Sequence, residues 1–184
     1  RRAWLDEAAV LVEADLLEDP SAQAAAHDAI GRTYQSLALY AEAEDHLEKA
    51  LELRRALHPE DHADLASSLH HFGTLLQDDN RFSDAEPLLR EALAMRQRLY
   101  ATDHPDLAES LNSVGLILQF RKEHTAADAM HEEAMRMYRR LFGDNHADVI
   151  RTLNLLGSSQ LNQFQFAEAK ALFHEALDLK LALF

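Results

Sequence analysis

The chain has 184 residues, and 47% of them are hydrophobic, which is enough to bury one substantial core. Its 32 acidic residues outnumber the 18 basic ones and set a formal net charge of −14. We therefore expect no nucleic acid partner, because an acidic surface repels phosphates. The absence of cysteine excludes disulfides, thiolate catalysis and cysteine-ligated zinc.

The same composition favours helix throughout. Glycine (5) and proline (4), the two costly residues in a helix interior, are scarce, and β-branched residues are few. We therefore expect an all-α protein. No apolar run approaches the roughly 18 residues of a membrane span, so we expect a cytoplasmic protein without a membrane partner. Because the chain opens with Arg1-Arg2 rather than with methionine, we expect it to be a fragment of a longer protein.

Several kinds of residue recur at a fixed step of 42 positions, as from Gly31 to Gly73. Glycine follows this step at Gly31, Gly73, Gly115 and Gly157. Alanine follows it in two series, Ala43, Ala85, Ala127 and Ala169, and Ala50, Ala92, Ala134 and Ala176. A period of 20 to 50 residues is typical of solenoids, whose neighbouring repeats bury each other's apolar sides.

In chain order, the sequence predicts one solenoid domain over residues 1–184 that begins inside a repeat. Residues 1–19 are predicted to form half a repeat with a single helix, because Trp4–Ala8 aligns with His46–Ala50. Four repeats follow, each with a helix A and then a helix B. Their bounds are 20–61, 62–103, 104–145 and 146–184.

The second repeat shows the pattern of both helices. Helix A is predicted over 63–77, with one buried stripe of Leu65, Leu69, Phe72 and Leu76. A turn over 78–81 follows, and helix B is predicted to begin with a capping box at Ser83–Glu86 and to continue to about Tyr100. A second capping box is predicted at Thr125–Asp128.

Each new repeat is predicted to begin at a histidine. His104 precedes Pro105, which suits the first helical turn, so we expect His104 to cap helix A, with His62 and His146 at the same corner. Gly73 is predicted to let helix B approach helix A closely, and Ala92 to pack tightly on helix B. His131 replaces the leucine or phenylalanine of the other repeats, and Gln160 replaces a large tyrosine or leucine, so we expect looser packing at both positions.

The order of glycine, aromatic and alanine positions resembles that of the tetratricopeptide repeat, whose usual length is about 34 residues. The 42-residue length is similar to the variant found in kinesin light chains and in bacterial multidomain proteins. The likeness rests on residues 84–89, 104–112 and 141–146 and covers essentially the whole chain. It implies a right-handed superhelical solenoid whose A helices line a concave groove for an extended peptide or a helix.

One side of each A helix is polar and lies opposite the apolar stripe when residues are placed at 100° intervals. We predict that these sides form the peptide-binding groove, in which Asn112 and Asn154 pair with a peptide backbone. The predicted groove residues are Asp28, Arg32, Gln35, Ser67, His70, Thr74, Gln77, Glu109, Asn112, Leu116, Gln119, Arg151, Asn154, Ser158 and Leu161.

The leading hypothesis is a protein–protein interaction scaffold that holds a peptide or helix of a partner protein. Two alternatives stay open: a regulatory sensor whose ligand-dependent shape controls a tethered effector domain, and a structural spacer that stacks end to end. We expect no enzyme activity, no catalytic residue, no cofactor and no metal. The nearest metal candidate, His58–His62, contains Pro59, which hinders the helix that would bring both rings to one side.

Both ends of the chain carry apolar helix B residues where solenoids normally carry a polar cap. We therefore predict weak end-to-end self-association. The residues concerned are Trp4, Leu5, Leu11 and Leu16 at one end and Leu177, Leu179, Leu181 and Phe184 at the other.

Overall fold

The computed structural model describes residues 19–183, and this part of the chain forms eight α-helices and no strand. The described residues divide into an N-terminal unit that ends at Met95 and a C-terminal unit that begins at Arg96. The predicted half repeat and its apolar residues before Asp19 lie outside the described residues. Whether one solenoid domain spans the chain stays a prediction.

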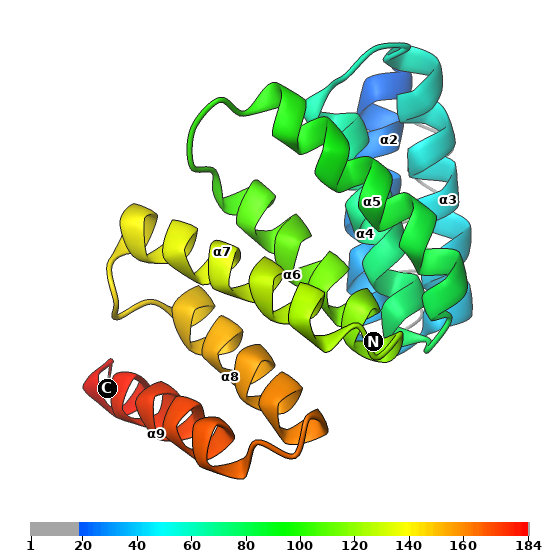
Figure 1. Ribbon diagram of the computed structural model, residues 1–184. Coiled ribbons are helices and arrows are strands. Elements are labelled where there is room, and N and C mark those ends of the chain that lie inside the picture. Colours follow the sequence, from blue (N-terminus) through cyan, green and yellow to red (C-terminus); the bar gives the residue numbers. More distant parts are fainter. Residues whose placement is uncertain (1–18, 184) are drawn as a thin grey trace. The chain divides into compact units, whose positions relative to one another are not determined.

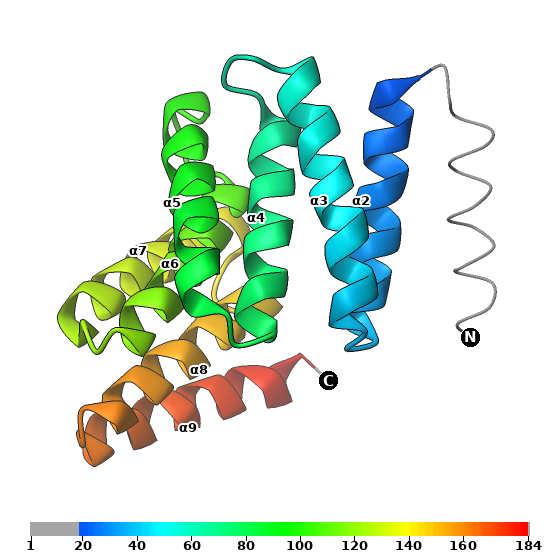
Figure 2. The same ribbon diagram turned by 90° about the vertical axis from the view of Figure 1, so that its right-hand side faces the viewer.

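Each unit consists of helices that follow one another in antiparallel order (Figures 1 and 2). The N-terminal unit holds α2 (Pro20–Ser36), α3 (Tyr40–Leu57), α4 (Ala63–Asp78) and most of α5 (Phe82–Leu99). The C-terminal unit holds α6 (Pro105–Phe120), α7 (His124–Phe142), α8 (Ala147–Asn162) and α9 (Phe166–Ala182). The even-numbered helices are the predicted A helices and the odd-numbered ones the B helices. None of these described helices has the length and apolar character that a membrane crossing requires.

Helices pack on their neighbours in the chain and, on one side, on the next A helix. In the N-terminal unit α2 packs on α3, α3 on α4, and α2 also contacts α4. In the C-terminal unit α6, α7 and α8 repeat this arrangement, and α9 packs on α8. Each A helix therefore has a B helix on one side and another A helix on its flank.

A histidine begins three of the A helices, as predicted. The Nδ1 atoms of His62, His104 and His146 accept hydrogen bonds from the backbone N–H two residues later, at 3.2, 3.2 and 3.3 Å. Each ring also stacks on a ring four residues earlier, with centroids 3.6 to 4.2 Å apart. These stacking partners are His58, Tyr100 and Phe142, a 42-residue series that the sequence pattern did not reveal.

The turns from A to B helices each contain a residue with positive φ. The B helices begin directly after these turns, so the predicted capping boxes at Ser83–Glu86 and Thr125–Asp128 are wrong. Ala38, Asn80, Lys122 and Phe164 take φ between 57° and 63°. This left-handed residue lets the next N–H bond back into helix A, as Arg81 N does to Leu76 O at 2.8 Å. The B helices follow directly, so Ser83 lies inside α5, and the N-cap of α7 is Glu123, which makes no side-chain capping bond.

The glycines allow the close approach of the two helices in each pair. A Cβ atom added to Gly31 would lie 2.6 Å from Leu47 Cγ, and one added to Gly115 would lie 2.5 Å from His131 Cε1. Both distances are shorter than any real Cβ contact, which confirms the predicted role of glycine. His131 is fully buried and lies as close to its glycine as Leu47 does, contrary to the looser packing expected there.

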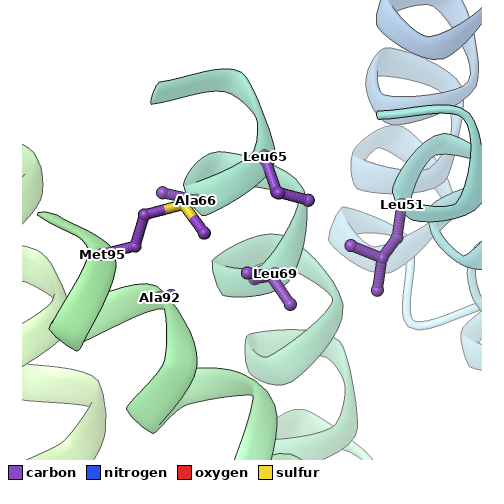
Figure 3. Close-up of a cluster of buried hydrophobic side chains, with 6 residues drawn as sticks. All are labelled: Leu51, Leu65, Ala66, Leu69, Ala92 and Met95. Atoms are coloured by element: carbon purple, nitrogen blue, oxygen red, sulfur yellow. The ribbon is translucent and has the colours of Figure 1, made fainter. Parts of the chain in front are cut away.

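The apolar core continues from one helix pair to the next. Figure 3 shows Leu51 of α3 directed toward Leu65 and Leu69 of α4. On the other side of α4, Ala66 faces Ala92 and Met95 of α5. Ala92 is fully buried, as its predicted tight contact requires.

Candidate functional site

The candidate site is the polar side of the A helices, and the structure divides its predicted residues into two classes. The first class comprises Asp28, His70 and Asn112, which are equivalent positions 42 residues apart and are only 6%, 2% and 2% exposed. A side chain this deeply buried cannot present its polar group to a peptide. The assignment of these three residues to an open groove is therefore corrected. They lie on the flanks of the A helices.

Asp28 joins α2 to the next A helix in the N-terminal unit. Its Oδ1 accepts a hydrogen bond from His71 Nδ1 of α4 at 2.7 Å, and Arg54 Nη1 of α3 lies 3.4 Å from the same oxygen. Burial by itself would raise the pKa of Asp28. The hydrogen bond from His71 and the charges of His71, Arg54 and Arg32 outweigh burial and hold this pKa below its usual 3.8.

Asn112 has the equivalent position in the C-terminal unit and joins α6 to α8. Its Nδ2 donates to Thr152 Oγ1 of α8 at 2.8 Å, and the Thr152 hydroxyl donates to the carbonyl of Asp148 at 2.8 Å. Its Oδ1 is thus left as the acceptor for His131 Nδ1 of α7, at 2.9 Å. Both atoms of the Asn112 amide are thus bonded within the protein, and the buried side chain is not accessible to a peptide backbone.

This network also determines the protonation of His131. Since Nδ1 donates to Asn112, the neutral ring accepts at Nε2, where the amide of Gln119 donates at 3.0 Å. Burial lowers the pKa of His131 to about 4, and the negative charge of Asp128 offsets only part of that effect. His131 is therefore a neutral, buried part of the joint between helices at physiological pH.

Two glutamines of the predicted groove also bond the next A helix. Gln35 Nε2 donates to Asp78 Oδ2 of the next A helix at 2.7 Å, and Gln119 Nε2 donates to the carbonyl of Leu155 at 3.2 Å. Gln77 is buried. Like Asp28 and Asn112, Gln35 and Gln119 thus connect adjacent A helices within a unit.

The second class of predicted residues lies on the accessible side of the A helices. In the N-terminal unit Arg32 is exposed, and Ser67 and Thr74 are partly exposed. In the C-terminal unit Glu109 and Leu116 are partly exposed, and the fourth-repeat residues Arg151, Asn154, Ser158 and Leu161 are exposed. Asn154 and Leu161 are equivalent to Asn112 and Gln119, so they lie on the flank of α8 and not on its accessible side.

Two apolar residues of this accessible side were missed. Phe120 stands four positions after Leu116 on α6 and is 57% exposed, and Leu155 stands four positions after Arg151 on α8 and is partly exposed. Phe120 is at i+11 from Glu109 and Leu155 is at i+4 from Arg151, spacings that return to the same side of a helix. We name the accessible residues the A-face: Arg32, Ser67 and Thr74 in the N-terminal unit, and Glu109, Leu116, Phe120, Arg151, Leu155 and Ser158 in the C-terminal unit.

A second set of bonds, also missed from the sequence, runs from B helices to the next A helix. Arg54 Nη1 donates to Ser68 Oγ at 2.8 Å and to the carbonyl of Asp64 at 3.1 Å. Arg96 Nη1, 42 residues later, donates to Ser110 Oγ and to the carbonyl of Asp106, both at 2.8 Å. The third member of the series is Tyr138, which is buried.

The structure also brings together three potential metal ligands, with atoms of His58, His62 and Asp64 within 4.8 Å of one another. The two rings are parallel within 3°, with centroids 3.6 Å apart. An imidazole binds a metal in the plane of its ring, so two parallel stacked rings cannot both point at one ion. In the third repeat the position of His58 is occupied by Phe142, which has no ligand atom in its side chain. The geometry fits helix capping.

The comparisons with known proteins agree with this architecture. A family model described as tetratricopeptide repeat matches residues 22–98, 81–140 and 106–182. A comparison with curated protein sequences finds no match. Among solved structures, BtubC (BKLC) from P. vanneervenii is similar with a TM-score of 0.82 and 22% identity, over 97% of this chain and 74% of that one.

Two further solved structures are similar over nearly the whole chain. A putative kinesin light chain from Podosopora anserina, with nearly identical TPR-like repeats, has a TM-score of 0.72 and 18% identity, over 96% of this chain and 87% of that one. MamA has a TM-score of 0.65 and 20% identity, over 96% and 88%. At these identities the likeness concerns the fold. Because the family model matches most of its length, the chain belongs to the tetratricopeptide repeat family and has the all-α solenoid fold of that family.

Proposed function

We propose that this chain is a protein-interaction scaffold that binds a peptide or helix of a partner protein on the A-face and has no catalytic activity of its own. Tetratricopeptide repeat proteins generally bind protein partners. The observation that carries the proposal is the division of the polar A-helix residues into two classes. Asp28, Gln35, Asn112 and Gln119 bond adjacent A helices to each other, and the A-face residues remain accessible beside them.

The two units offer different chemistry to such a partner. In the N-terminal unit the A-face carries Arg32 and the hydroxyls of Ser67 and Thr74, and it suits a polar peptide. In the C-terminal unit Leu116, Phe120 and Leu155 form an apolar side. A buried apolar anchor is the usual source of affinity at an interface. We therefore propose that the partner places an apolar side chain on the C-terminal unit.

Selection of random peptides displayed on phage tests this proposal. We expect enrichment of peptides that share an apolar residue. Their affinity for the chain should fall at least about tenfold with Leu116→Asp, because a charge replaces the apolar contact. Leu37→Asp provides the control, since Leu37 is an exposed leucine in the turn after α2. Peptides that bind Leu116→Asp as tightly as the parent would refute the A-face as their site.

A further inference from the structure

A hollow of about 480 Å³ lies between α7 and α9, on the side of α8 that faces away from the A-face. Both helices pack against α8 (Figure 1). The lining combines apolar side chains with a few charged ones. Arg136 Nη1 lies 4.0 Å from Glu132 Oε2, so these two charges offset each other, and the remaining charge of the lining is that of Glu168.

The carboxylates at this hollow have equivalents in the N-terminal unit that share one arginine. Asp128 of α7 stands two repeat lengths after Glu44 of α3. Glu168 of α9 stands at the same interval after Asp84 of α5. Arg81 Nη1 donates to both oxygens of Glu44, at 2.8 and 2.7 Å, and its Nε donates to Asp84 Oδ2 at 3.1 Å. One guanidinium thus serves the carboxylates of two successive B helices.

In the C-terminal unit this arginine is replaced by a glutamine. Gln165 occupies the position of Arg81. The carboxylate of Asp128 is bonded only through Oδ2, which accepts from the amides of Gln160 and Gln163 at 3.1 and 2.8 Å. Its Oδ1 and the amide oxygen of Gln160 are buried and accept no hydrogen bond within the described residues. Because an unpaired buried acceptor is costly, these two oxygens favour a donor from outside the chain.

The part of the hollow formed by α8 is less filled than its N-terminal counterpart. Leu156 takes the place of the larger Phe72, and Gln160 takes the place of Leu76. Leu156 and Leu172 of α9 both line the hollow, next to Gln160. An apolar wall that leads to acceptors and to negative charge suits an arginine, whose aliphatic stem ends in five N–H donors.

We propose that the hollow between α7 and α9 binds the side chain of an arginine from a partner protein. The aliphatic stem packs on Leu156 and Leu172. The guanidinium donates to Gln160 Oε1 and lies near Asp128 and Glu168, as Arg81 lies between their equivalents. Lysine suits the site less well, because its ammonium lacks the planar fork of donors. This site is separate from the A-face and does not depend on the function proposed there.

Methyl NMR of the full chain tests the site. The chain contains four methionines, and Met135 lines the hollow. The tripeptide acetyl-Leu-Arg-Leu-amide should shift the Met135 methyl signal saturably, with a Kd of about 1 mM. The same peptide with citrulline in place of arginine has nearly the same shape and no charge, and it should bind at least about tenfold more weakly. The signal of Met95, which is buried in the N-terminal unit, should not move.

Substitutions of exposed residues separate binding from folding. Glu168→Gln should weaken binding about threefold, the effect of one exposed ion pair. Gln165→Arg restores the arginine of the N-terminal unit within the chain and should abolish binding, because its own side chain then occupies the site. Glu133→Gln is the matched control, since Glu133 is an exposed glutamate of α7 outside the lining of the hollow. Leu116→Asp, which alters the A-face, should also leave this binding unchanged.

Three outcomes would overturn the proposal. One is a Met135 signal that stays in place at about 10 mM peptide. Another is equal binding of the citrulline peptide, which would exclude recognition of the guanidinium. The third is free arginine that binds as tightly as the tripeptide, because the occupant would then be a small molecule and not a partner protein.

Discussion

The N-terminal and C-terminal units build the same joint between A helices from different chemistry. In the N-terminal unit the carboxylate of Asp28 takes a hydrogen bond from His71 of the next A helix, beside the charged Arg54. In the C-terminal unit the equivalent residue is Asn112, and a neutral His131 on the paired B helix bonds to it. The repeat therefore determines where buried polar groups meet, while the chemistry of these groups varies as long as each donor finds an acceptor.

Because the two joints differ in charge, acid should weaken them in different pH ranges. The N-terminal joint depends on an ionised carboxylate whose pKa is lowered by its partners. The C-terminal joint depends on an unprotonated imidazole whose pKa is lowered to about 4 by burial. Five measurements test the differences between the two units, from the largest expected effect to the smallest.

Asp28→Ala should destabilise the N-terminal unit by about 3–5 kcal/mol, because it leaves His71 and Arg54 partly buried without their shared carboxylate. Urea denaturation measures the loss of unfolding free energy. Asp28→Asn is the matched control, since its amide oxygen still accepts from His71, and it should cost less. An equal cost for both substitutions would show that the charge, and not the hydrogen bond, stabilises the joint.

Acid should weaken the C-terminal unit before the N-terminal one. The pKa of His131 is about 4 in the folded chain and 6.5 for an unperturbed histidine, so the unfolded chain binds more protons between these values. The contribution of His131 is complete above pH 6.5 and falls by about 3 kcal/mol as the pH drops to 4. The contribution of Asp28 is lost only below its unfolded pKa of 3.8. Hydrogen exchange at pH 5 should therefore show α6–α8 opening before α2–α4.

His131→Leu provides the control for the acid response. Leucine stands at the equivalent positions Leu47 and Leu89, so its shape suits the site above Gly115. The substitution leaves Asn112 and Gln119 without the imidazole and should cost about 1–3 kcal/mol at pH 7. It should also remove the slope of stability between pH 4 and 6.5. If that slope persists, a different group titrates in this range.

Ala92→Leu should destabilise the N-terminal unit by about 1–3 kcal/mol, because the fully buried Ala92 leaves no room for added methylenes. Ala176→Leu changes the equivalent residue on α9, whose Leu177 and Leu181 are exposed, and we expect a smaller loss there. Melting temperatures of the two variants give the comparison. An unchanged melting temperature for Ala92→Leu would contradict the packing of α4 against α5.

The turns between helices should show the smallest effect. Lys122 and Asn80 take φ of 63° and 60° at equivalent positions. Asparagine tolerates this conformation better than lysine does, so Lys122→Asn should stabilise the C-terminal unit by about 0.5–1 kcal/mol. Asn80→Lys should destabilise the N-terminal unit by a similar amount. Thermal denaturation of both variants tests the pair, and shifts of the same sign would be inconsistent with a backbone origin.

Much of the fold follows from the 42-residue period in the sequence. The periodic glycines predict the close contacts between helices seen at Gly31 and Gly115. The histidines that begin each new repeat predict the N-caps at His62, His104 and His146. The capping boxes failed because the left-handed turn residue satisfies the end of helix A with backbone bonds, and helix B begins at once. No single-residue rule marks Ala38 or Lys122 for that conformation.

The candidate site was only half predictable, for a geometric reason. A helical wheel with one apolar stripe assigns all polar residues opposite it to solvent. An A helix in a solenoid packs against a B helix and also against the A helix beside it, so its flanks are buried too. Asp28 and His71 are 43 positions apart, as are Gln35 and Asp78, and such complementary pairs about one period apart are the signal that finds these joints.

Glycine beneath each B helix makes one position of the repeat interchangeable. Leu47, Leu89, His131 and Phe173 all lie directly over a glycine, although their side chains range from aliphatic to imidazole to phenyl. The room they occupy is supplied by the missing side chain of the glycine in helix A, and it accommodates all three kinds of group. A chain organised in this way can acquire an ionisable or aromatic group in a single repeat while the adjoining repeats keep their own dimensions.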